Sequence, residues 1–445
     1  MPNDSSQATC TRRQFLNKTA QSGAGVMGVG FMTQLAAGRK IGPNDRINLA
    51  VIGVGGQGTL HFKYQTEGNK AVRVAALCDV DKKRLATAVK KVPGNHKVKT
   101  YDDYRKLLED KDIHCVLVAT PNHWHALQTV HACQAEKDVY VEKPATHCVS
   151  EGPKMIEAAK KYDRVVQVGT HKRANPGRRE AMRLLREGLL GEVYQAEFNF
   201  FRARNSIGTK PNGPVPAGVN YDLWLGPAPK RPFNPNRFHY NWHWFWDYGG
   251  GELANNGPHY IDMIVEGLGR QDEFPEKVSC QGGRYVWNDQ GETPNSATAL
   301  YRYADGTRIT LSVLDQISKN GQRAESDLIT FRGEKGIMKL GMRGDFTTIV
   351  NNKPGPKHEA MKGTAHSRLA ANFYDVVRSR KVEDLLSPPE YGHVVASVCH
   401  LGNIAYRCGQ DLCIDPATQT ILDNETASAL LTRTYREPYV MPEVV

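Results

Sequence analysis

The sequence predicts an α/β protein, in which an N-terminal Rossmann-type doubly wound parallel sheet precedes a C-terminal α+β domain with a large, mainly antiparallel sheet. Over residues 45–170, short apolar runs alternate with helical segments, and a glycine-rich turn follows the first run. Over residues 277–350, strand-like runs are separated by turns. Strands that alternate with helices build parallel sheets, whereas strands joined by turns build antiparallel ones.

The first strand and its turn lie in the sequence RINLAVIGVGGQG, which begins at residue 46. Its apolar residues indicate a short buried strand. In a strand–turn–helix unit, Gly53 permits the turn, Gly55 lets the backbone approach a pyrophosphate, and Gly58 lets the helix pack on the strand. The free amides at the start of the helix, at Gly56 and Gln57, then face the phosphates. This glycine pattern alone is a weak signal, because glycine-rich turns are common.

An acidic residue strengthens the prediction of a dinucleotide site. A second apolar run, residues 72–78, ends at Asp79, about 20 residues past the last glycine, where an acid binds the ribose hydroxyls of adenosine. No arginine directly follows, and a 2′-phosphate would meet the carboxylates of Asp79 and Asp81. The sequence therefore favours NAD over NADP.

Two further strands complete the expected cofactor cleft. Residues 115–120 are continuously apolar, as in a strand buried on both faces of a parallel sheet, and residues 138–141 form the next strand. Ligands bind outside the carboxyl ends of such strands. The residues expected there to contact the cofactor are Thr120, Pro121, Asn122, His125, Glu142 and Lys143.

The rest of the chain divides into a substrate-binding domain, residues 171–365, and C-terminal helices with a tail, residues 366–445, that pack back on the body. Three of the six tryptophans fall within residues 242–246. Aromatic faces with polar tips suit a sugar, but they equally suit a hydrophobic plug in the interdomain cleft. One face of the second sheet can form a subunit interface, so we expect a homo-oligomer.

These motifs, together with ATPNHWHA at 119–126 and VEKP at 141–144, resemble the Gfo/Idh/MocA family, named for glucose–fructose oxidoreductase and inositol dehydrogenase. The resemblance extends over nearly the whole chain after residue 45. It implies a nicotinamide-dependent enzyme that acts on sugars, cyclitols and their derivatives, with Lys143 at the reaction centre and His259 as catalytic histidine. The family usually has an aspartate four residues before that histidine, whereas this chain has Asn255, which can bind a hydroxyl but cannot take its proton.

The acid/base chemistry therefore falls to Lys143 and His259, with Asp262 expected to orient the histidine. A lysine beside a dinucleotide can stabilise a hydroxyl that loses its proton, although it could also merely pair with Glu142. The expected substrate contacts are Lys143, His171, Arg173, Trp242, His243, Asn255 and His259. A metal site from histidines 239, 243 and 259 matches no known ligand spacing, and none is expected.

Residues 1–40 resemble a twin-arginine export signal with a linker. TRRQFLNK at 11–18 precedes a Gly- and Ala-rich run that is too polar to anchor well in a membrane. The alternatives are an ordinary basic N-terminus or a poor transmembrane helix. We expect a periplasmic or otherwise exported protein without an integral membrane segment after signal removal.

The overall charge does not point to nucleic acid. The 445 residues carry a net charge of +11, of which the first 40 residues supply +4 (five Lys or Arg and one Asp), leaving +7 without any block of like charges. A solvated basic surface is the simpler interpretation. Three functions remain open: an NAD-dependent oxidoreductase; a redox-neutral NAD-dependent glycosidase or lyase like the related N-acetylgalactosaminidases, whose substrate-loop pattern is not found here; and a non-catalytic sugar- or NAD-binding protein, against which Lys143 and His259 argue.

Overall fold

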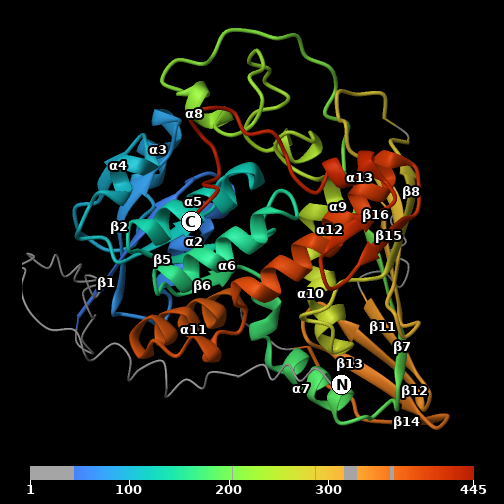
Figure 1. Cartoon of the computed structure of the whole chain (residues 1–445). Coiled ribbons are helices and arrows are strands. Elements are labelled where there is room, and N and C mark those ends of the chain that lie inside the picture. Colours follow the sequence, from blue (N-terminus) through green and yellow to red (C-terminus); the bar gives the residue numbers. More distant parts are fainter. Residues whose placement is uncertain (1–44, 203, 286, 315–327, 361–364) are drawn as a thin grey trace, which may run out of the picture. The chain divides into compact units, whose positions relative to one another are not determined.

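The computed structural model describes residues 45–445 except 203, 286, 315–327 and 361–364 (Figure 1). The expected export signal at residues 1–40 lies outside the described residues. The described residues belong to one compact unit. Within it, one parallel and one mainly antiparallel sheet are present, and the predicted fold class is confirmed.

The first sheet has six strands in the order β3-β2-β1-β4-β5-β6. Every neighbouring pair is parallel. The strands are β1 (Ile47–Ile52), β2 (Val72–Cys78), β3 (Lys99–Tyr101), β4 (Cys115–Val118), β5 (Asp138–Val141) and β6 (Val166–Val168). The strand order reverses between β1 and β4, and ligands of open α/β sheets bind at this switch point.

Helices cover both faces of this sheet. They are α2 (Gly56–Thr66), α3 (Lys82–Val89), α4 (Tyr104–Leu108), α5 (Asn122–Gln134), α6 (Glu151–Lys161) and α11 (Ala365–Ser379). Although α11 is remote in sequence, its Phe373 packs in the same hydrophobic cluster as Phe62 of α2 and Val51 of β1. On the opposite face, Tyr439 of the C-terminal tail packs with Trp124 of α5.

The second sheet has ten strands in the order β14-β13-β12-β11-β7-β10-β9-β8-β15-β16. Its central pair, β7 and β10, is parallel, and the other neighbouring pairs are antiparallel. The strands are β7 (Val193–Phe201), β8 (Lys277–Gly283), β9 (Ser296–Arg302), β10 (Arg308–Leu314), β11 (Leu328–Gly333), β12 (Gly336–Gly341), β13 (Phe346–Val350), β14 (Lys353–Pro354), β15 (Leu412–Asp415) and β16 (Thr420–Leu422).

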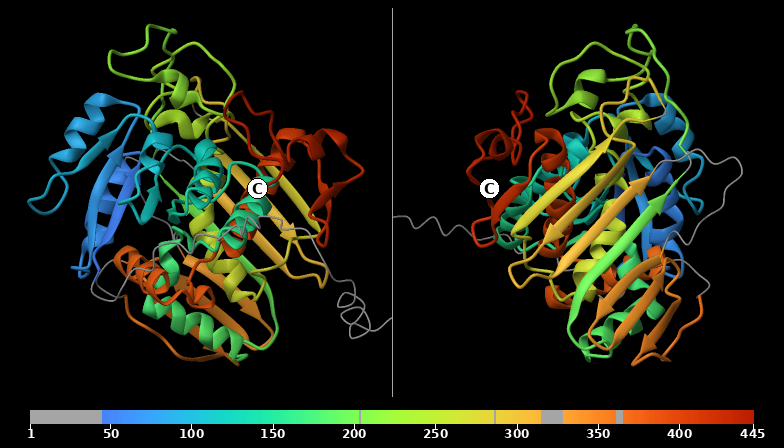
Figure 2. Two further views of the ribbon diagram at one scale, coloured as in Figure 1. Left: turned by 60° about the vertical axis from the view of Figure 1, so that its left-hand side comes forward. Right: turned by 90° about the vertical axis from the view of Figure 1, so that its right-hand side faces the viewer.

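Helices cover one face of the second sheet, and no helix of the described residues covers the other (Figure 2). The covering helices are α7 (Pro176–Arg186), α9 (Gly251–Asn255), α10 (Gly257–Gly267) and α12 (Pro389–Cys408), and α13 (Glu425–Ala429) follows β16. The period-two pattern of β7 explains the packing, since Phe198 and Phe200 are buried and Phe198 stacks on Tyr260 of α10 at 3.7 Å. The uncovered face carries exposed Tyr194 and Leu300.

The segment between β7 and α9 crosses from the second sheet to the first. We call residues 204–248 the covering segment; it contains the short helix α8 (Tyr221–Leu225) and the 3-10 helix η2 (Asn241–Trp244). Val219 forms an antiparallel bridge with Asp81, directly after β2. Figure 1 shows α8 above the carboxyl ends of the first sheet. The second domain therefore reaches the cofactor cleft through this segment.

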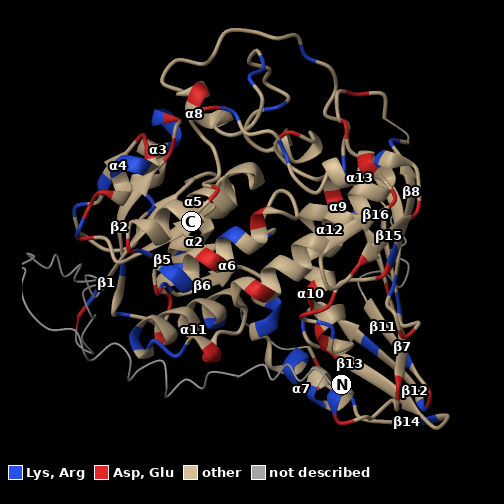
Figure 3. Ribbon diagram, viewed as in Figure 1, with Lys and Arg blue, Asp and Glu red and all other residues tan. Residues whose placement is uncertain are grey.

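Charged residues are interspersed rather than segregated. Figure 3 shows Lys and Arg mixed with Asp and Glu over most elements, while α5 and α12 are almost free of charge. No helix within the described ranges is both long and apolar enough to cross a membrane.

Candidate active site

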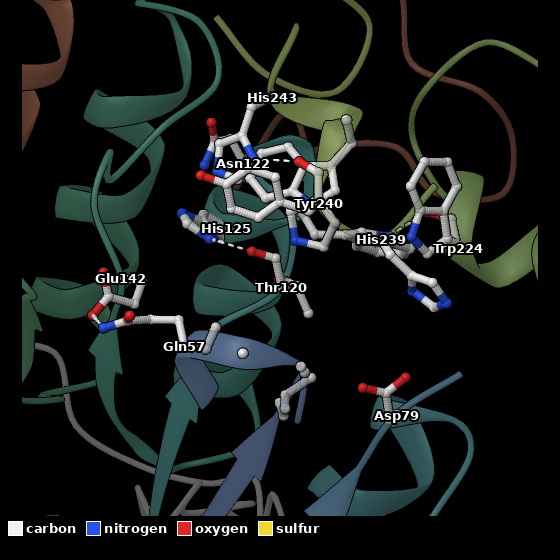
Figure 4. A pocket seen from close by; sticks show the side chains of 18 of the residues that line it. Gln57, Asp79, Thr120, Asn122, His125, Glu142, Trp224, His239, Tyr240 and His243 are labelled. Carbon is white, nitrogen blue, oxygen red and sulfur yellow. Dashed lines mark hydrogen bonds between the residues drawn. The ribbon is translucent and has the colours of Figure 1, made fainter. Parts of the chain in front are cut away.

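A cavity of about 510 Å³ lies where β1 and β4 end, and both domains line it. From the first domain come the glycine turn and the strand ends: Gly53, Gly55, Gly56, Gln57, Asp79, Thr120, Pro121, Asn122, His125, Glu142 and Lys143. From the second come Trp242, His243 and Asn255. Figure 4 shows Glu142 and Gln57 at one end of the cavity and Asp79 at the other. Most predicted site residues are thus brought together.

The glycine turn requires glycine at two positions. Gly53 has a φ of +85°, and a Cβ there would lie 2.7 Å from the carbonyl oxygen of Ala119. Gly58 does not line the cavity; a Cβ on it would lie 1.9 Å from the carbonyl oxygen of Gly53. Because neither glycine has a Cβ, the start of α2 can lie directly against β1, and the free amides of the helix face the cavity. This cradle fits a pyrophosphate group.

Asp79 lies at the rim of the turn. Its carboxylate accepts hydrogen bonds from the backbone amides of Val54 (2.9 Å) and Asp81 (2.9 Å). Burial raises its pKa above the ordinary value, although these amides and Arg84 act in the opposite direction. Arg84 also lines the cavity. The sequence rule considered only residues next to Asp79 and missed this arginine, which one turn of α3 brings back to the site.

His125 connects the ends of β4 and β5. Its ring nitrogens lie 2.7 Å from the carbonyl oxygen of Pro144 and 2.8 Å from that of Thr120. The hydroxyl of Thr120 donates to Gln128 at 2.8 Å. The residues after the two strands are therefore held in a fixed relation, with Lys143 between them.

Glu142 is bound to a histidine that the sequence analysis missed. Nε2 of buried His61, on α2, lies 2.6 Å from a carboxylate oxygen of Glu142. Burial alone would raise the pKa of Glu142, but the contact with His61 outweighs it and the pKa lies well below the ordinary range. Within the described chain, no ion pair joins Lys143 to Glu142, whose partner is His61. The position of His61, one helical turn after Gly58, was the feature of the sequence that could have indicated this contact.

Lys143 reaches across to the second domain. Its Nζ donates to the backbone oxygen of Asn255 at 2.9 Å and lies 3.4 Å from the side-chain oxygen of the same residue. Burial lowers the pKa of Lys143; Glu142 and Glu252 raise it, and nearby Arg202 and Arg204 lower it further. A buried amine with a lowered pKa can give up and regain a proton more readily than an exposed lysine.

His259 and His171 lie near Lys143, although neither lines the cavity. Their ring centroids are 4.9 Å apart, and His171 stacks on His366 at 3.5 Å. Nδ1 of His259 is buried and has no hydrogen-bond partner within the described residues. Burial and the positive charge of Lys143 lower the pKa of His259 well below its ordinary value. Its ring is therefore neutral at pH 7.

The sequence suggested that Asp262 orients His259, but the structure gives Asp262 other partners. It is buried and binds Arg173 at 2.5 Å and Arg178 at 3.0 Å. Arg173, expected to contact substrate, is 5% exposed, does not line the cavity and lies over the ring of Tyr391. The spacing of His259 and Asp262 along one helix could not reveal that two arginines from another segment form ion pairs with the Asp262 carboxylate.

The tryptophan-rich stretch serves both roles that the sequence left open, a ligand-facing surface and a hydrophobic plug. Trp242 and His243 line the cavity and stack on each other at 3.6 Å. Burial lowers the pKa of His243 to about 3, so it too is neutral. Trp244 and Tyr248 instead join a hydrophobic cluster with Trp224 of α8. The stretch is both a cavity wall and a plug.

Several residues that line the cavity were not among the predicted site residues. They are Arg84, Arg202, Arg204, Trp224, Phe238, His239, Tyr240 and Asn256. Most belong to the covering segment, whose return to the first domain cannot be inferred from local patterns. No cluster of three or more His, Cys, Asp or Glu residues suited to a metal occurs in the part of the chain that the structure describes.

Comparison with protein families matches both domains. Residues 47–170 match the GFO_IDH_MocA model described as oxidoreductase family, NAD-binding Rossmann fold. Residues 193–441 match the GFO_IDH_MocA_C2 model, described as oxidoreductase family, C-terminal alpha/beta domain. The cofactor of the matched first domain is NAD, in agreement with the glycine turn and Asp79.

Individual relatives match over shorter segments. Inositol 2-dehydrogenase of Salmonella typhimurium is 30% identical over 158 residues, which are 35% of this chain and 46% of that protein. A glycosyl hydrolase family 109 protein of Shewanella pealeana is 29% identical over 161 residues, 34% of this chain and 35% of that protein. The chain thus matches less than half the length of these relatives.

The fold is similar to that of a solved aldose–aldose oxidoreductase from Caulobacter crescentus, crystallised with glycerol. The TM-score is 0.64 at 18% identity, with 83% of this chain and all of that chain covered. At this identity the comparison establishes the fold alone.

Proposed function

Because this chain belongs to the Gfo/Idh/MocA oxidoreductase family, we propose that it is an exported NAD-dependent oxidoreductase that acts on a hydroxyl or carbonyl group of a sugar, glycoside or cyclitol. The observation that carries the proposal is the position of Lys143. This half-buried amine lies in the same cavity as the glycine turn and Asp79, and it contacts Asn255 from the second domain. The cavity thus combines a dinucleotide cradle with a titratable group.

The residues of the chain have distinct roles in this proposal. The amides that begin α2 bind the pyrophosphate, and Asp79 binds the adenosine ribose. NAD supplies hydride transfer when it is bound. Lys143 takes the proton of the substrate hydroxyl, and neutral His259, with its unpartnered Nδ1, is a second acceptor. Asn255 holds Lys143 and binds a hydroxyl without exchanging its proton.

The surroundings of the cavity support a carbohydrate substrate. Trp242 and His243 offer stacked rings beside Lys143, and aromatic faces complement the apolar faces of sugar rings. Arg202 and Asn256 add hydrogen-bond donors to the lining. Inositol 2-dehydrogenase, among the relatives, is consistent with a polyhydroxylated substrate.

Export makes retention of the cofactor a part of the proposal. A protein moved folded across a membrane meets little free NAD outside, so a cofactor released at each turnover would be lost. NAD is therefore held through export and regenerated on the protein, with the hydride returned to a second substrate.

A redox-neutral glycosidase or lyase is the alternative. In that reaction the same substrate takes the hydride back after a bond is broken. The relatives of glycosyl hydrolase family 109 favour it, at 29% identity over 161 residues. A non-catalytic sugar- or NAD-binding protein is disfavoured by the buried, pKa-shifted Lys143. The uncovered face of the ten-stranded sheet is the surface we propose for homo-oligomerisation.

The test is whether purified protein carries nicotinamide through gel filtration and turns over without added NAD. Pyranosides are screened with NAD reduction and glycoside cleavage read in parallel. We expect bound nicotinamide close to one per chain, and turnover of at least one sugar or glycoside. If the protein leaves the column empty and works only with millimolar NAD, the retained-cofactor cycle is refuted and an ordinary dehydrogenase is the better description.

A further inference from the structure

The covering segment is fastened to the first domain next to the acid that binds the adenosine ribose. The backbone amide of Asn220 donates to the oxygen of Val80 at 2.9 Å, and that of Lys82 donates to Gly218 at 3.0 Å. Together with the bridge between Asp81 and Val219, these bonds form a short ladder. The loop after β2, which begins at Asp79, is therefore covered by the second domain.

Two rings of the covering segment enter the cavity beside this ladder. His239 and Phe238 both line it, with their centroids 3.8 Å apart. Nε2 of His239 lies 3.4 Å from the carboxylate of Asp81. Burial and nearby Arg84 lower the pKa of His239 to about 4, so the ring is uncharged at neutral pH. Figure 4 shows His239 and Trp224 facing Asp79 across the cavity.

Arg84, on α3 of the first domain, also lines the cavity. Its Nη1 is 2.7 Å from the place where a Cβ on Gly55 would be, directly over the glycine turn. Its guanidinium makes no hydrogen bond or ion pair within the described chain. A planar cation and uncharged rings that line the same cavity suit a flat heteroaromatic group, because both stack on π-systems.

We propose that Phe238 and His239 of the covering segment, together with Arg84 of α3, form the binding subsite for the adenosine half of the dinucleotide. Asp79 holds the ribose within it. The cofactor is then enclosed by the second domain, and it leaves only when the covering segment detaches. This inference rests on the proposed function for its cofactor and explains how that cofactor is retained.

The C-terminal tail and α5 hold the covering segment in place. Arg436 donates to the carboxylate of Asp222 at 2.8 Å, to the backbone oxygen of Asp222 at 2.7 Å and to that of Gly226 at 2.8 Å. The indole of Trp124 donates to the backbone oxygen of Trp224 at 3.1 Å. Detachment must break these bonds together, which makes release slow.

The test measures release rates with two probes, NADH and reduced nicotinamide mononucleotide, which lacks the adenosine half. Displacement of each is followed by nicotinamide fluorescence for the full-length protein and for His239→Ala and Arg436→Ala. We expect His239→Ala to speed NADH release by about threefold to tenfold, the size expected for one lost ring contact. Arg436→Ala, which removes the hydrogen bonds that hold the covering segment, should also speed NADH release, and both variants should leave mononucleotide binding unchanged. Arg183→Ala is the control, because Arg183, like Arg436, makes side-chain ion pairs, here to Glu180 and Glu187, but it lies on α7 and does not line the cavity.

Unchanged NADH release in both variants would overturn the proposal, as would equal weakening of both probes. If Arg436→Ala fails to fold, His239→Ala decides alone, since the side chain of His239 is 37% exposed. Failure of the proposed function is a separate result: wild-type protein that loses NAD on a column refutes retention, whereas the comparison of the two probes still reports on the adenosine subsite.

Discussion

Lys143 is the residue on which the proposed chemistry depends. Its amine contacts Asn255 of the second domain, whereas the glycine turn and Asp79 are proposed to hold the cofactor, so Lys143→Met should leave NAD bound. Turnover of a substrate found in the glycoside screen should fall by roughly 10²–10⁴, as for the loss of a positioned acid/base group. Bound nicotinamide is measured in parallel as the control. Near-normal turnover would show that the lysine is structural.

The pH dependence of the wild-type activity is a second test of the role of Lys143. Burial lowers the pKa of Lys143, so the limb of kcat/KM on which the rate rises with pH should have its midpoint below 10.5, the ordinary lysine value. This limb should be absent in Lys143→Met. A limb shared by both proteins would assign the titration to another group.

At the residue scale, the sequence predicted groups that follow strands and missed those that reach the cavity through tertiary packing. Asp79 and Lys143 could be placed because each directly follows a buried strand. Arg84 could not, since its side chain returns to the glycine turn from the first turn of α3. The partner of Asp262 was also mistaken, because Arg173 and Arg178 approach from a segment about 85 residues earlier.

At the scale of elements, the contact between β1 and α2 makes a sharp prediction. A methyl group on Gly58 would lie 1.9 Å from the backbone oxygen of Gly53, so Gly58→Ala must displace the helix from the strand. We expect it to lower the free energy of unfolding by about 1–3 kcal/mol, the usual cost of overpacking. Urea denaturation of protein stripped of nucleotide measures this.

The matched control is Gly56→Ala in the same turn. A Cβ at Gly56 meets nothing within 4 Å, and alanine is favoured over glycine in a helix. Its free energy of unfolding should equal or slightly exceed that of the wild type. An equal loss in both variants would mean that the turn, and not the helix–strand contact, is the sensitive feature.

Most strands of both sheets could be predicted because their periodicity is local, whereas the short strands β3, β15 and β16 were not predicted. The buried runs of β1 and β4 and the alternation in β7 are visible in the sequence alone. The parallel pairing of β7 with β10 and the crossing of the covering segment were not, since each depends on contacts between distant segments. The same limit applies to α11, which packs on the first sheet although most strands of the second sheet lie between them in the sequence.

At the scale of the whole molecule, burial of neutral histidines predicts sensitivity to acid. His123, at the contact of α5 with the covering segment, is fully buried, and burial lowers its pKa to about 3. His400, in α12, is 6% exposed, and burial lowers its pKa to about 4. Both join the first domain to other parts of the molecule, through Trp224 and Thr146 respectively.

The sign follows from proton binding. In the unfolded chain each histidine takes up a proton as the pH falls below about 6.5, whereas in the folded chain it stays unprotonated until the pH reaches 3 to 4. Stability is therefore complete above pH 6.5 and falls with pH below it. The loss should be about 2 kcal/mol per histidine between pH 6.5 and 5. Denaturant unfolding at pH 7 and pH 5 measures this loss.

The variant His400→Gln tests the contribution of one histidine, because its amide can still donate to Thr146. It should reduce the difference in the free energy of unfolding between pH 7 and pH 5 by about 2 kcal/mol, even if the variant is less stable at both pH values. An undiminished difference would show that His400 takes up its proton in the folded protein.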